Sequence, residues 1–469
     1  MAEPLDAARR PVLFVSAQDT GQLNPLMVLA GELARRGVPD LLFATDEPRR
    51  TEIESLSGTS EMRFVSLGGV PPEWTATAWD DRTYRAMMRG SGFGALRGMV
   101  QHYIDPTVGP DKYRRLAAVV DEHRPALMVI DALSGFGIDV AITKGIPFVL
   151  SLTLMPSNML SASTPFGKSY TPRDFPTPFS GQPYPMNPLQ QVANRLFRLR
   201  TIAMFLDPRV ITRMKAWLRA RKELGISPRT LEPMARFEHA ERVVCYTVAE
   251  LDYPFPIPDK VALVGAMIPP LPQAADGRDV IDWLDRQSSV IYVCFGTITR
   301  LTRHEIHAIV EVARRLDGRH HVLWKVPAQQ QRMLPPKTQL PANLRIESWL
   351  PSQLDVLAHP KVELFVNHAG GNAFHEGLYF GKPQVMRPLW LDCYDQAVRG
   401  EAAGIGLALD NPQGFDPDDV MDKVLRVLDN PSFTERAEHL AALQQAAGGR
   451  HKAADLLLDL MARVRTTTS

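Results

Sequence analysis

Short apolar runs alternate with amphipathic helical segments along most of this chain, and that alternation limits the fold more than any other feature. Near the start, an apolar run at 12–16 precedes a helical pattern over 24–36, and another apolar run follows at 40–45. The second half repeats the order, with an apolar run at 289–297 before a helical pattern over 303–315. Strands separated by helices form parallel sheets with helices on both faces. The sequence therefore predicts an α/β protein built from doubly wound, Rossmann-like sheets.

A proline-rich segment divides the alternating pattern into two parts. Residues 253–260 read YPFPIPDK, which has neither a helical nor a strand pattern. We therefore predict a first domain over 1–252, a linker at 253–260 and a second domain over 261–446. The last segment, 447–469, is expected to be a helix that crosses back to the first domain. Two such domains leave a cleft between them, which is a preferred place for ligands.

The first domain carries an insertion over 156–235 that breaks the alternation. Its first part, 156–190, is rich in proline, glycine and aromatic residues, so we expect a long irregular loop. Its second part is helical and is broken by Pro208. Between positions 195 and 222 there are nine Lys and Arg residues, and Asp207 is the one acid. Such a basic helix has either a solvated face or a face for peripheral contact with an anionic membrane, and the sequence leaves both open.

The overall composition argues against several classes of protein. The formal net charge is +1, which gives no general attraction to nucleic acid. Three scattered cysteines are too few for a disulfide framework or a zinc cluster, so we expect reduced thiols and no metal site. No apolar run approaches the ~20 residues of a membrane span, and the first one is too short for a signal peptide. We therefore expect a cytoplasmic protein.

One turn in the second domain is typical of phosphate binding. An apolar strand at 362–368 ends in the turn HAGGN, and a helical pattern follows. Gly370 and Gly371 allow the backbone to approach a ligand closely, and the free N–H groups of a helix N-terminus favour phosphate. His368 lies at the same turn and can donate a hydrogen bond. Together these residues predict a site for a phosphorylated ligand.

Three further residues extend this pattern to a whole nucleotide. Glu376 lies about two helical turns beyond His368, where a carboxylate can bind ribose hydroxyls. Trp349 ends the preceding strand, where its ring can stack on a base, and Gln353 can bind the edge of that base. A structural turn with a core tryptophan is the alternative, and the number of suitably spaced residues argues against it.

This region resembles the signature of the family 1 UDP-glycosyltransferases, which have the GT-B fold of two Rossmann-like domains facing a cleft. The family pattern is roughly W-x-P-Q-x-x-L-x-H, H-x-G-x-N/G-S/T, E, G-x-P and P-x-x-x-D-Q. This chain reads WLPSQLDVLAH, HAGGNAFHE, GKP and PLWLD. The segment LDCYDQAVR is similar to the fungal-type branch, and matches at 21–25, 129–131 and 294–297 extend the resemblance over the whole chain. The resemblance implies an acceptor-binding first domain and a second domain that binds a nucleotide-sugar donor, expected to be a UDP-sugar.

The resemblance also implies roles for single residues. It implies that Trp349 and Gln353 bind the nucleotide base and that Glu376 binds the ribose. The residues that it places at the diphosphate are His368, Gly370, Gly371, Asn372, Ala373 and Thr297. Those that it places at the sugar are Asp392, Cys393 and Thr153. The chain departs from the family pattern by one extra residue between Trp349 and Gln353. It departs again at Cys393, where the family usually has glutamine, so a donor sugar other than plain glucose is an open alternative.

The stretch SAQDTGQLNPL, at 16–26, departs from the family at the position of its general base. The family reads G-H-x-x-P here, and its histidine takes the acceptor proton, but this chain has Gln22 at that place. An amide has no useful basicity, so Gln22 can only orient or hydrogen-bond a substrate. Asp131, at a matching strand end, or Asp19 could act as the base directly with a pKa raised by burial. Helix capping is the alternative role for Asp19, and His102 is a further candidate base.

Gln22 is also compatible with two alternatives that need no catalytic base. An acidic acceptor could arrive already ionised, or the chain could bind the donor without transferring the sugar. The corresponding alternatives to a transferase are a catalytically impaired auxiliary protein that binds a nucleotide sugar and a GT-B nucleotide-sugar epimerase or hydrolase.

The expected activity is inverting transfer of a hexose from a nucleotide-diphosphate sugar to a hydroxyl or acidic group of a small lipophilic or aromatic acceptor. No cofactor or metal is expected beyond this co-substrate, because helix N–H groups and His368 would stabilise the leaving diphosphate. The sequence makes no prediction about the oligomeric state. The side chains expected to form the acceptor pocket are those of 153–187 together with Trp74, Trp79, Met87, Met88 and Phe93.

Overall fold

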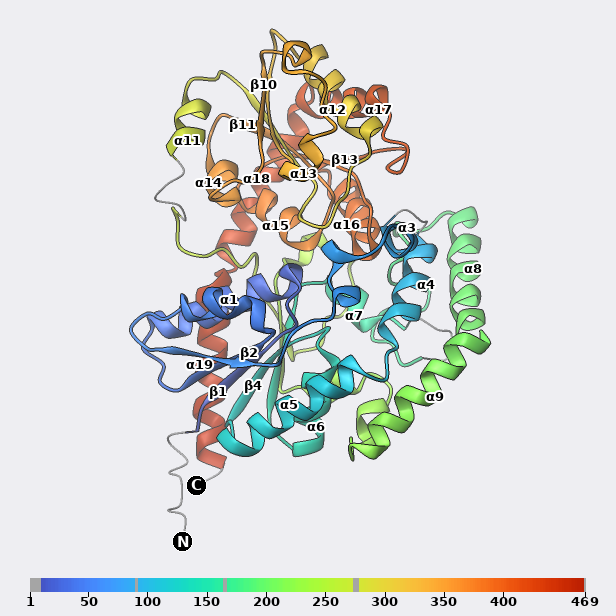
Figure 1. The fold of residues 1–469 in the computed structure, drawn as a ribbon, viewed down its shortest axis with the longest axis vertical. Coiled ribbons are helices and arrows are strands. Elements are labelled where there is room, and N and C mark those ends of the chain that lie inside the picture. The colour runs from blue at the N-terminus through green and yellow to red at the C-terminus, as the bar shows by residue number, and fades with distance from the viewer. Residues whose placement is uncertain (1–9, 89–91, 163–166, 273–277, 468–469) are drawn as a thin grey trace.

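Two parallel sheets, one in each half of the chain, form the framework of the molecule. The computed structural model describes residues 10–88, 92–162, 167–272 and 278–467. The first nine positions of the predicted first domain and four positions of its predicted loop lie outside the described residues. The two domains are stacked end to end, with the blue-to-green domain below and the yellow-to-red domain above (Figure 1). This arrangement is the predicted α/β architecture of two doubly wound domains.

The first domain contains a seven-stranded parallel sheet in the order β3-β2-β1-β4-β5-β6-β7. Its strands read as short apolar runs because both faces are covered by helices. One face packs on α1, α2 and α19, and the other packs on α5 and α6. The strands are β1 (Val12–Val15), β2 (Leu41–Thr45), β3 (Met62–Ser66), β4 (Leu127–Asp131), β5 (Phe148–Leu152), β6 (Arg242–Cys245) and β7 (Val261–Leu263).

The helices of the first domain include those that cover the sheet and those of the insertion. They are α1 (Thr20–Arg35), α2 (Arg50–Glu54), α3 (Asp81–Met88), α4 (Gly92–Tyr103), α5 (Val108–His123), α6 (Gly135–Lys144), α7 (Pro156–Leu160), α8 (Pro188–Phe205), α9 (Pro208–Glu223) and α10 (Ala235–Glu238). Short 3₁₀ turns occur at Glu47–Arg49, Pro72–Trp74, Ala76–Ala78, Pro228–Leu231 and Ala249–Leu251. Among the described residues, no helix is both long enough and apolar enough to cross a bilayer.

The second domain contains a six-stranded parallel sheet in the order β10-β9-β8-β11-β12-β13. Its strands are β8 (Val290–Cys294), β9 (His321–Lys325), β10 (Leu344–Glu347), β11 (Val362–Asn367), β12 (Gln384–Met386) and β13 (Gly406–Ala408). Its helices are α11 (Arg278–Asp285), α12 (Arg303–Arg315), α13 (Ala328–Gln331), α14 (Gln353–Ala358), α15 (Gly371–Tyr379), α16 (Leu391–Ala402), α17 (Pro417–Leu428) and α18 (Pro431–Ala446), with a 3₁₀ turn at Lys337–Gln339.

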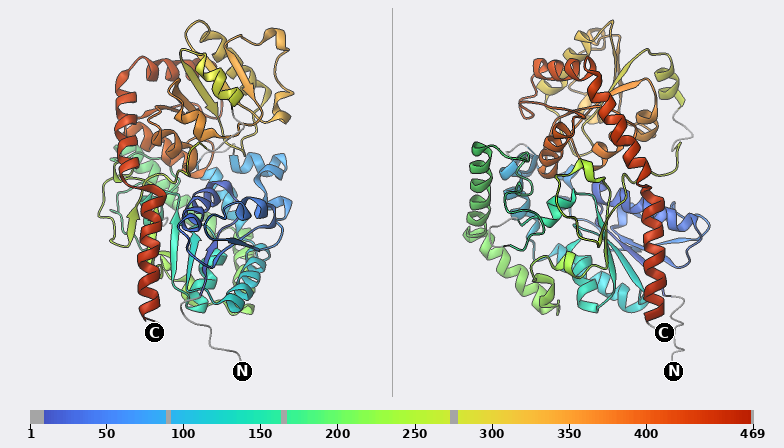
Figure 2. Two further views of the ribbon diagram at one scale, coloured as in Figure 1. Left: turned by 90° about the vertical axis from the view of Figure 1, so that its left-hand side faces the viewer. Right: turned by 180° about the vertical axis from the view of Figure 1, so that it is seen from behind.

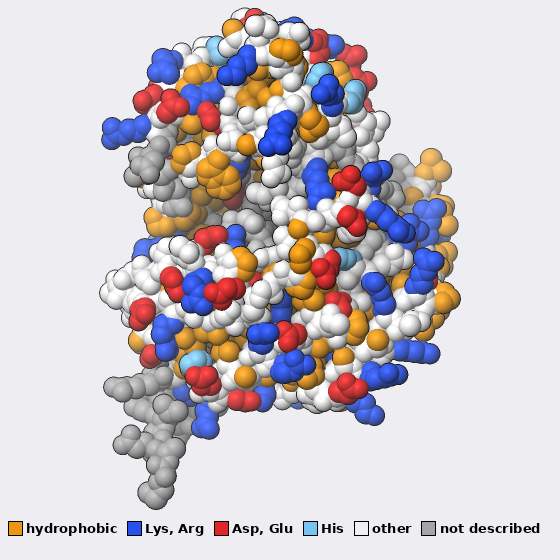
Figure 3. Space-filling model, viewed as in Figure 1, with side chains coloured by type: hydrophobic (Ala, Val, Ile, Leu, Met, Phe, Trp, Pro, Cys, Tyr) orange, Lys and Arg blue, Asp and Glu red, His pale blue; other side chains and the backbone are white. Residues whose placement is uncertain are grey.

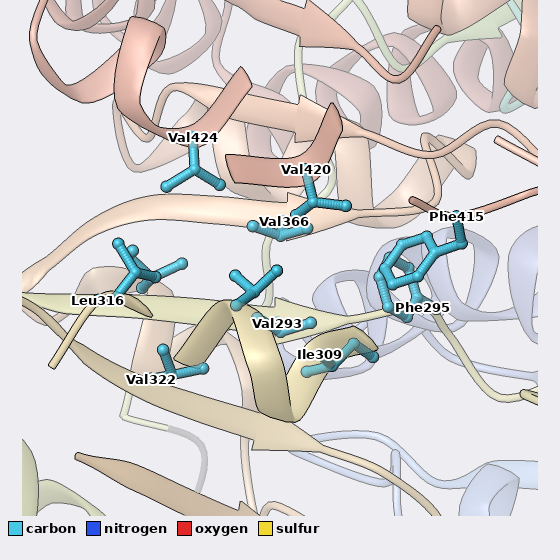
Figure 4. A pocket seen from close by; sticks show the side chains of 11 residues that line it. Val293, Phe295, Ile309, Leu316, Val322, Val366, Phe415, Val420 and Val424 are labelled. Atoms are coloured by element: carbon cyan, nitrogen blue, oxygen red, sulfur yellow. The ribbon is translucent and has the colours of Figure 1, made fainter. Parts of the chain in front are cut away.

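The core of the second domain is closely packed around the central strands. A cavity of about 10 Å³ lies between β8, β11, α12 and α17, and its wall is entirely apolar (Figure 4). That volume is at the lower limit for one water molecule, and an apolar wall offers a water no hydrogen bonds. The cavity is therefore a packing defect of the core.

The boundary between the domains lies later in the chain than predicted. β7 pairs with β6 in the first sheet, with Val243 opposite Val261. The predicted linker at 253–260 thus connects two strands of one sheet, and the predicted start of the second domain at 261 is wrong. Three residues of strand are too few to show a clear pattern in the sequence, which is why the proline-rich segment before them looked like the boundary.

The last helix, α19 (Gly449–Thr467), returns to the first domain as predicted. It continues from α18 and runs down the length of the lower domain, which Figure 2 shows from behind. Its buried residues Ala453, Leu457 and Met461 belong to the same apolar cluster as α1 and the first sheet. The first domain is therefore completed by the C-terminal segment.

In each sheet, the strand order reverses next to one central strand. β1 lies between β2 and β4, and β8 lies between β9 and β11. Ligands of open α/β sheets bind at the carboxyl ends of strands beside such a reversal. The loops after β1, β8 and β11 are therefore the places to look for a site.

Candidate active site

The N-terminal ends of α1 and α15 meet where the two domains face each other. The Asn372 side-chain amide donates a hydrogen bond to the Thr20 carbonyl at 3.2 Å. A Cβ atom at Gly371 would lie 3.4 Å from the Thr153 carbonyl, so the backbones of the two domains come close here. The space-filling view shows the surface hollowed between the domains (Figure 3). Because helix N-termini carry free N–H groups and partial positive charge, this meeting point can hold an anion.

The turn after β11 is shaped around a histidine. Ala369 has a positive φ of 57°, and its N–H donates to the Asn367 side chain at 2.7 Å. A Cβ atom at Gly370 would lie 2.3 Å from Nε2 of His368, and one at Gly296 would lie 2.8 Å from its Cε1. A side chain at either glycine would clash with the imidazole. The two glycines therefore make room for His368 as well as for any ligand.

The imidazole of His368 is neutral at physiological pH. Burial lowers its pKa to about 4. Its Nδ1 atom is buried and has no hydrogen-bond partner among the described residues. His368 can therefore offer a diphosphate one N–H hydrogen bond, but it does not supply a positive charge.

Gln353 and Glu376, predicted to bind the nucleotide base and the ribose, are hydrogen-bonded to each other. The Gln353 amide donates to the Glu376 carboxylate at 2.7 Å and accepts from the Tyr292 hydroxyl at 3.0 Å. Burial raises the pKa of Glu376, and the hydrogen bond from Gln353 opposes that rise. Trp349 keeps 65% of its surface exposed, so its ring is available for stacking.

Two features of this group could not be foreseen from the motif. Lys325, at the end of β9, places its ammonium 4.3 Å from the centre of the Trp349 ring, and this cation covers part of one ring face. The extra residue before Gln353 is accommodated because Ser352 caps α14, accepting a hydrogen bond from the Asp355 N–H at 3.1 Å. The insertion therefore starts the helix without separating Gln353 from Glu376.

The predicted sugar-binding residues differ in their surroundings. Asp392 lies at the start of α16, and burial together with the charge of Asp395 raises its pKa to about 7. The Gln396 amide, which the sequence did not single out, donates to Asp392 at 3.3 Å. Cys393 is buried in the apolar cluster beneath α16, so its thiol does not face the cleft. Thr297 is exposed in the loop after β8, one residue from Gly296.

Gln22 is hydrogen-bonded to Thr153, the residue that follows β5 of the first sheet. The predicted loop is shorter than expected, because α1 begins at Thr20 and Gln22 lies in its first turn. Its amide oxygen accepts a hydrogen bond from the Thr153 hydroxyl at 2.5 Å. Both predicted residues therefore belong to the cleft, and each limits the rotation of the other.

Asp131 is enclosed by hydrogen-bond donors. Its carboxylate accepts from the Ser16 hydroxyl at 2.8 Å, from the Ser134 hydroxyl, and from the N–H groups of Ala17, Leu133 and Ser134. Burial raises its pKa, and these bonds oppose the rise. Only 1% of its surface is exposed. A carboxylate held this way organises the ends of β1 and β4 and has no access to a substrate.

Asp19 is the carboxylate that the cleft leaves available. It occupies the N-cap position of α1, but its side chain makes no capping hydrogen bond, so the alternative of a capping role is not what the structure shows. The residue is exposed, and it directly precedes Thr20, whose carbonyl meets Asn372 of the second domain. Partial burial and the neighbouring charge of Asp131 raise its pKa to about 6.

Aromatic rings form a wall beside Asp19. The ring of Trp74 meets that of Tyr103 edge-on at 4.8 Å, and the charge of Asp19 contributes to a raised pKa of Tyr103. Trp79 stacks on Trp390 of the second domain at 5.7 Å. His102 lies among these rings, and burial lowers its pKa, which makes it a neutral part of the wall.

The other predicted acceptor residues are placed differently. Met87 and Met88 are buried in an apolar cluster with Trp79, and Phe93 packs edge-on against Phe197 at 5.6 Å. These side chains support the wall from behind. Of the apolar residues predicted to line an acceptor pocket, Trp74 contacts both His102 and Tyr103, and Trp79 contacts His102.

Comparison with known proteins identifies the family. The family model described as "UDP-glucoronosyl and UDP-glucosyl transferase" matches residues 109–447. This chain belongs to that family. The match confirms the resemblance to UDP-glycosyltransferases and the predicted enzyme class, a glycosyltransferase.

Curated relatives of this glycosyltransferase include animal enzymes. The rat protein "UDP-glucuronosyltransferase 2B17" is 25% identical over 86% of this chain and 72% of its own length. The human protein "UDP-glucuronosyltransferase 2B7" is 26% identical over 69% of this chain and 59% of its own length. The chain thus spans between about six and seven tenths of these relatives.

Solved structures confirm the GT-B fold. The glycotransferase of kitacinnamycin superposes with a TM-score of 0.68 at 19% identity, covering 96% of this chain and 99% of the other. The UDP-glucose: anthocyanidin 3-O-glucosyltransferase, solved in complex with UDP, superposes with a TM-score of 0.67 at 19% identity, covering 98% and 99%.

Proposed function

We propose that this chain transfers a hexose, with inversion, from a UDP-sugar to a hydroxyl of a small lipophilic acceptor, and that Asp19 is the general base. The single observation that carries the choice of base is the contrast between two carboxylates at the same end of the first sheet. Asp131 is enclosed by five hydrogen bonds, whereas Asp19 faces the cleft and has a pKa near 6. A general base is most effective when its pKa is close to the working pH.

The proposed step is a single displacement. Asp19 takes the proton of the acceptor hydroxyl, the acceptor oxygen forms a bond to the anomeric carbon, and the bond from that carbon to the diphosphate breaks. The bonding electrons leave with the diphosphate, whose negative charge is received by the N-terminus of α15 and by the N–H of His368. Gln22 hydrogen-bonds to Thr153 and takes no part in moving the proton.

The donor assignment rests on the second domain. The exposed ring of Trp349 is proposed to stack on the nucleotide base. Glu376, hydrogen-bonded to Gln353, is proposed to bind the ribose hydroxyls. The family description and the UDP bound in a structural neighbour support a uridine nucleotide. Asp392 and Gln396 are proposed as partners of the sugar hydroxyls. The choice among hexoses stays open.

The acceptor assignment rests on the aromatic wall formed by Trp74, His102 and Tyr103, which favours a flat apolar molecule. A cytoplasmic location, independence from metal and a place in the fungal-type branch stay predictions.

A transfer assay with two matched variants tests the proposal. Purified protein is given UDP-glucose, UDP-glucuronate and other UDP-sugars with a panel of alcohols, phenols and carboxylic acids, and products are detected by mass spectrometry. Asp19→Asn is expected to reduce transfer to alcohols by about 10²-fold or more while UDP binding, measured by calorimetry, is unchanged.

The second variant and the acceptor panel separate the alternatives. Asp131→Asn is expected to lower the thermal stability, because it removes a hydrogen-bonded buried carboxylate. If Asp19→Asn transfers normally to alcohols, Asp19 is not the base. If phenols and acids alone react, the acceptor supplies its own ionised oxygen. Donor binding with no transfer at all would favour an auxiliary binding protein.

A further inference from the structure

The helix α8 carries an apolar stripe on its solvent side. Leu189, Val192, Leu196 and Leu199 recur at intervals that place them on one face of the helix. Leu189 is 81% exposed and Leu199 is 58% exposed, and Leu206 at the end of the helix is 68% exposed. Of eleven large hydrophobic side chains that are exposed among the described residues, eight lie between positions 189 and 231. Four of these eight form the stripe of α8, and exposed apolar side chains gathered on one helix face mark a binding surface.

The stripe is not needed to attach α8 to the protein. The opposite side of the helix is buried through Asn194, Phe197, Thr201 and Met204. Phe197 packs against α4. The helix therefore has one apolar face that packs internally and a second that faces solvent.

Cations surround the stripe and continue onto the next helix. Arg195 and Arg200 flank it on α8, and the exposed cations of α9 are Arg209, Arg213, Lys215, Arg219 and Lys222. α8 contains no acidic residue, and α9 contains one, at its last position. The two helices follow one another along the outer edge of the first domain (Figure 1), where orange and blue side chains alternate (Figure 3). The edge is thus apolar and positively charged together.

We propose that this edge, the docking edge formed by α8 and α9, binds the surface of a membrane that contains anionic lipids. The leucines of α8 enter the boundary between headgroups and acyl chains, and the cations of both helices contact the headgroups. A second copy of the chain fits less well, because the same cations would face each other. A headgroup surface is also broad enough to contact both helices at once.

The docking edge lies one helix away from the proposed acceptor wall. α8 packs on α4 through Phe197 and Phe93, and α4 ends in His102 and Tyr103. Docking would therefore bring the side of the first domain that carries the proposed acceptor wall close to the membrane. This consequence for the acceptor rests on the proposed function, whereas the docking itself does not.

Vesicle sedimentation tests the docking without any sugar donor. The full chain is mixed with vesicles of phosphatidylcholine alone and with vesicles in which about one third of the lipid is phosphatidylglycerol. The chain is expected to sediment with the anionic vesicles, and high salt is expected to weaken the binding. Leu199→Glu is expected to reduce the bound fraction about 10-fold, since it places a carboxylate in the apolar stripe. The control Leu271→Glu adds the same charge at an exposed leucine outside the docking edge and is expected to bind as the unaltered chain does.

Several outcomes would overturn the proposal. They are failure of the unaltered chain to bind anionic vesicles at low salt, equal binding by Leu199→Glu, and equal losses in both variants. A dimer that Leu199→Glu converts to a monomer, without vesicle binding, would assign the edge to contact between copies. UDP binding by each variant is measured in parallel, so a misfolded variant is recognised and failure of docking is distinguished from failure of the proposed transferase activity.

Discussion

At the residue scale, the cleft contains two carboxylates with opposite surroundings and a glutamine where a base would be expected. Asp131 is satisfied by protein donors, and Asp19 is not. Burial raises the pKa of both carboxyls, but Asp131 is enclosed whereas Asp19 is exposed, so Asp19 is the carboxylate suited to proton transfer. The same reasoning makes His368 a neutral donor, because burial holds its pKa at about 4.

The first prediction concerns the pH dependence of transfer. Asp19 must be ionised to accept a proton, and its pKa is about 6, so kcat/KM should rise as the pH is raised through 6 and level off above about 7. The measurement is the initial rate of transfer to an alcohol between pH 5 and 8, at a subsaturating acceptor concentration. In Asp19→Asn this inflection should be lost. A profile that keeps the inflection in that variant would assign it to another group.

The second prediction concerns Trp349. Replacing the exposed ring with alanine should weaken UDP binding by about 10-fold, since stacking on a base contributes about 1–3 kcal/mol. Calorimetric titration with UDP measures the change. Trp217→Ala, which removes a tryptophan from α9 in the first domain, serves as the control and should bind UDP normally. Equal affinity of Trp349→Ala and the unaltered chain would show that the base lies elsewhere.

At the scale of elements, one buried carboxylate adds polar contacts to the apolar packing between α1 and α19. Glu32 of α1 accepts from Arg36, the residue that follows α1, at 2.9 Å, and from Arg450 at 3.3 Å and His451 at 2.9 Å in α19. Although burial alone would raise the pKa of Glu32, its hydrogen bonds with Arg36 and Arg35 and the charge of His451 lower it to about 2. The ionised form therefore strengthens the attachment of the last helix to the first domain.

The third prediction follows from that lowered pKa. The stabilisation is complete above the ordinary glutamate pKa of about 4.5 and is lost as the pH falls toward 2. Glu32→Gln should lower the free energy of unfolding at pH 7 by about 3 kcal/mol, and the difference should shrink at acidic pH. Urea denaturation at several pH values measures it. Glu54→Gln removes an exposed ion pair with Arg50 and should change stability by less than about 1 kcal/mol. A Glu32→Gln cost that does not depend on pH would contradict the prediction.

Sequence reasoning succeeded for elements with long, regular patterns and failed for short or non-local ones. The sheets, the covering helices and the returning C-terminal helix follow from hydrophobic periodicity. β7 has three residues and was placed in the wrong domain. The hydrogen-bond donors around Asp131 come from the residues that follow β1 and from the loop that follows Asp131 itself. The enclosure of Asp131 therefore depends on the pairing of β1 with β4, two strands far apart in the sequence. The contact of Lys325 with Trp349 depends likewise on neighbouring strands.

At the scale of the whole molecule, a buried arginine joins the two domains behind the cleft. Arg399 of α16 donates to Asp252 at 3.0 Å, to the Ser157 hydroxyl at 2.7 Å and to the Asn158 carbonyl oxygen at 2.9 Å. In the same region Asp395 accepts from the Asn158 amide at 2.8 Å. Fully satisfied buried networks of this kind fix a single arrangement of the parts they join.

The fourth prediction tests this network. Arg399→Leu leaves Asp252 buried without its cation and should lower the free energy of unfolding by about 3–5 kcal/mol. Adding Asp252→Asn to Arg399→Leu should recover part of that loss. Calorimetry of the single and double variants gives the two values. Arg436→Leu, which breaks the exposed interdomain pair with Glu250, is the control and should cost less than about 1 kcal/mol. A loss no larger than in the control would mean that the buried network does not hold the domains together.

The return of α19 has a consequence for the order in which the chain folds during synthesis. Domains made first usually fold first, while the ribosome is still translating the rest. Here Ala453, Leu457 and Met461 fill one side of the first domain's core, and they are made only after the entire second domain. Until they emerge, that side of the first sheet lacks its covering helix and exposes apolar surface. The core of the first domain is therefore completed only after the second domain has been made, and until then its uncovered side is the kind of apolar surface that chaperones bind.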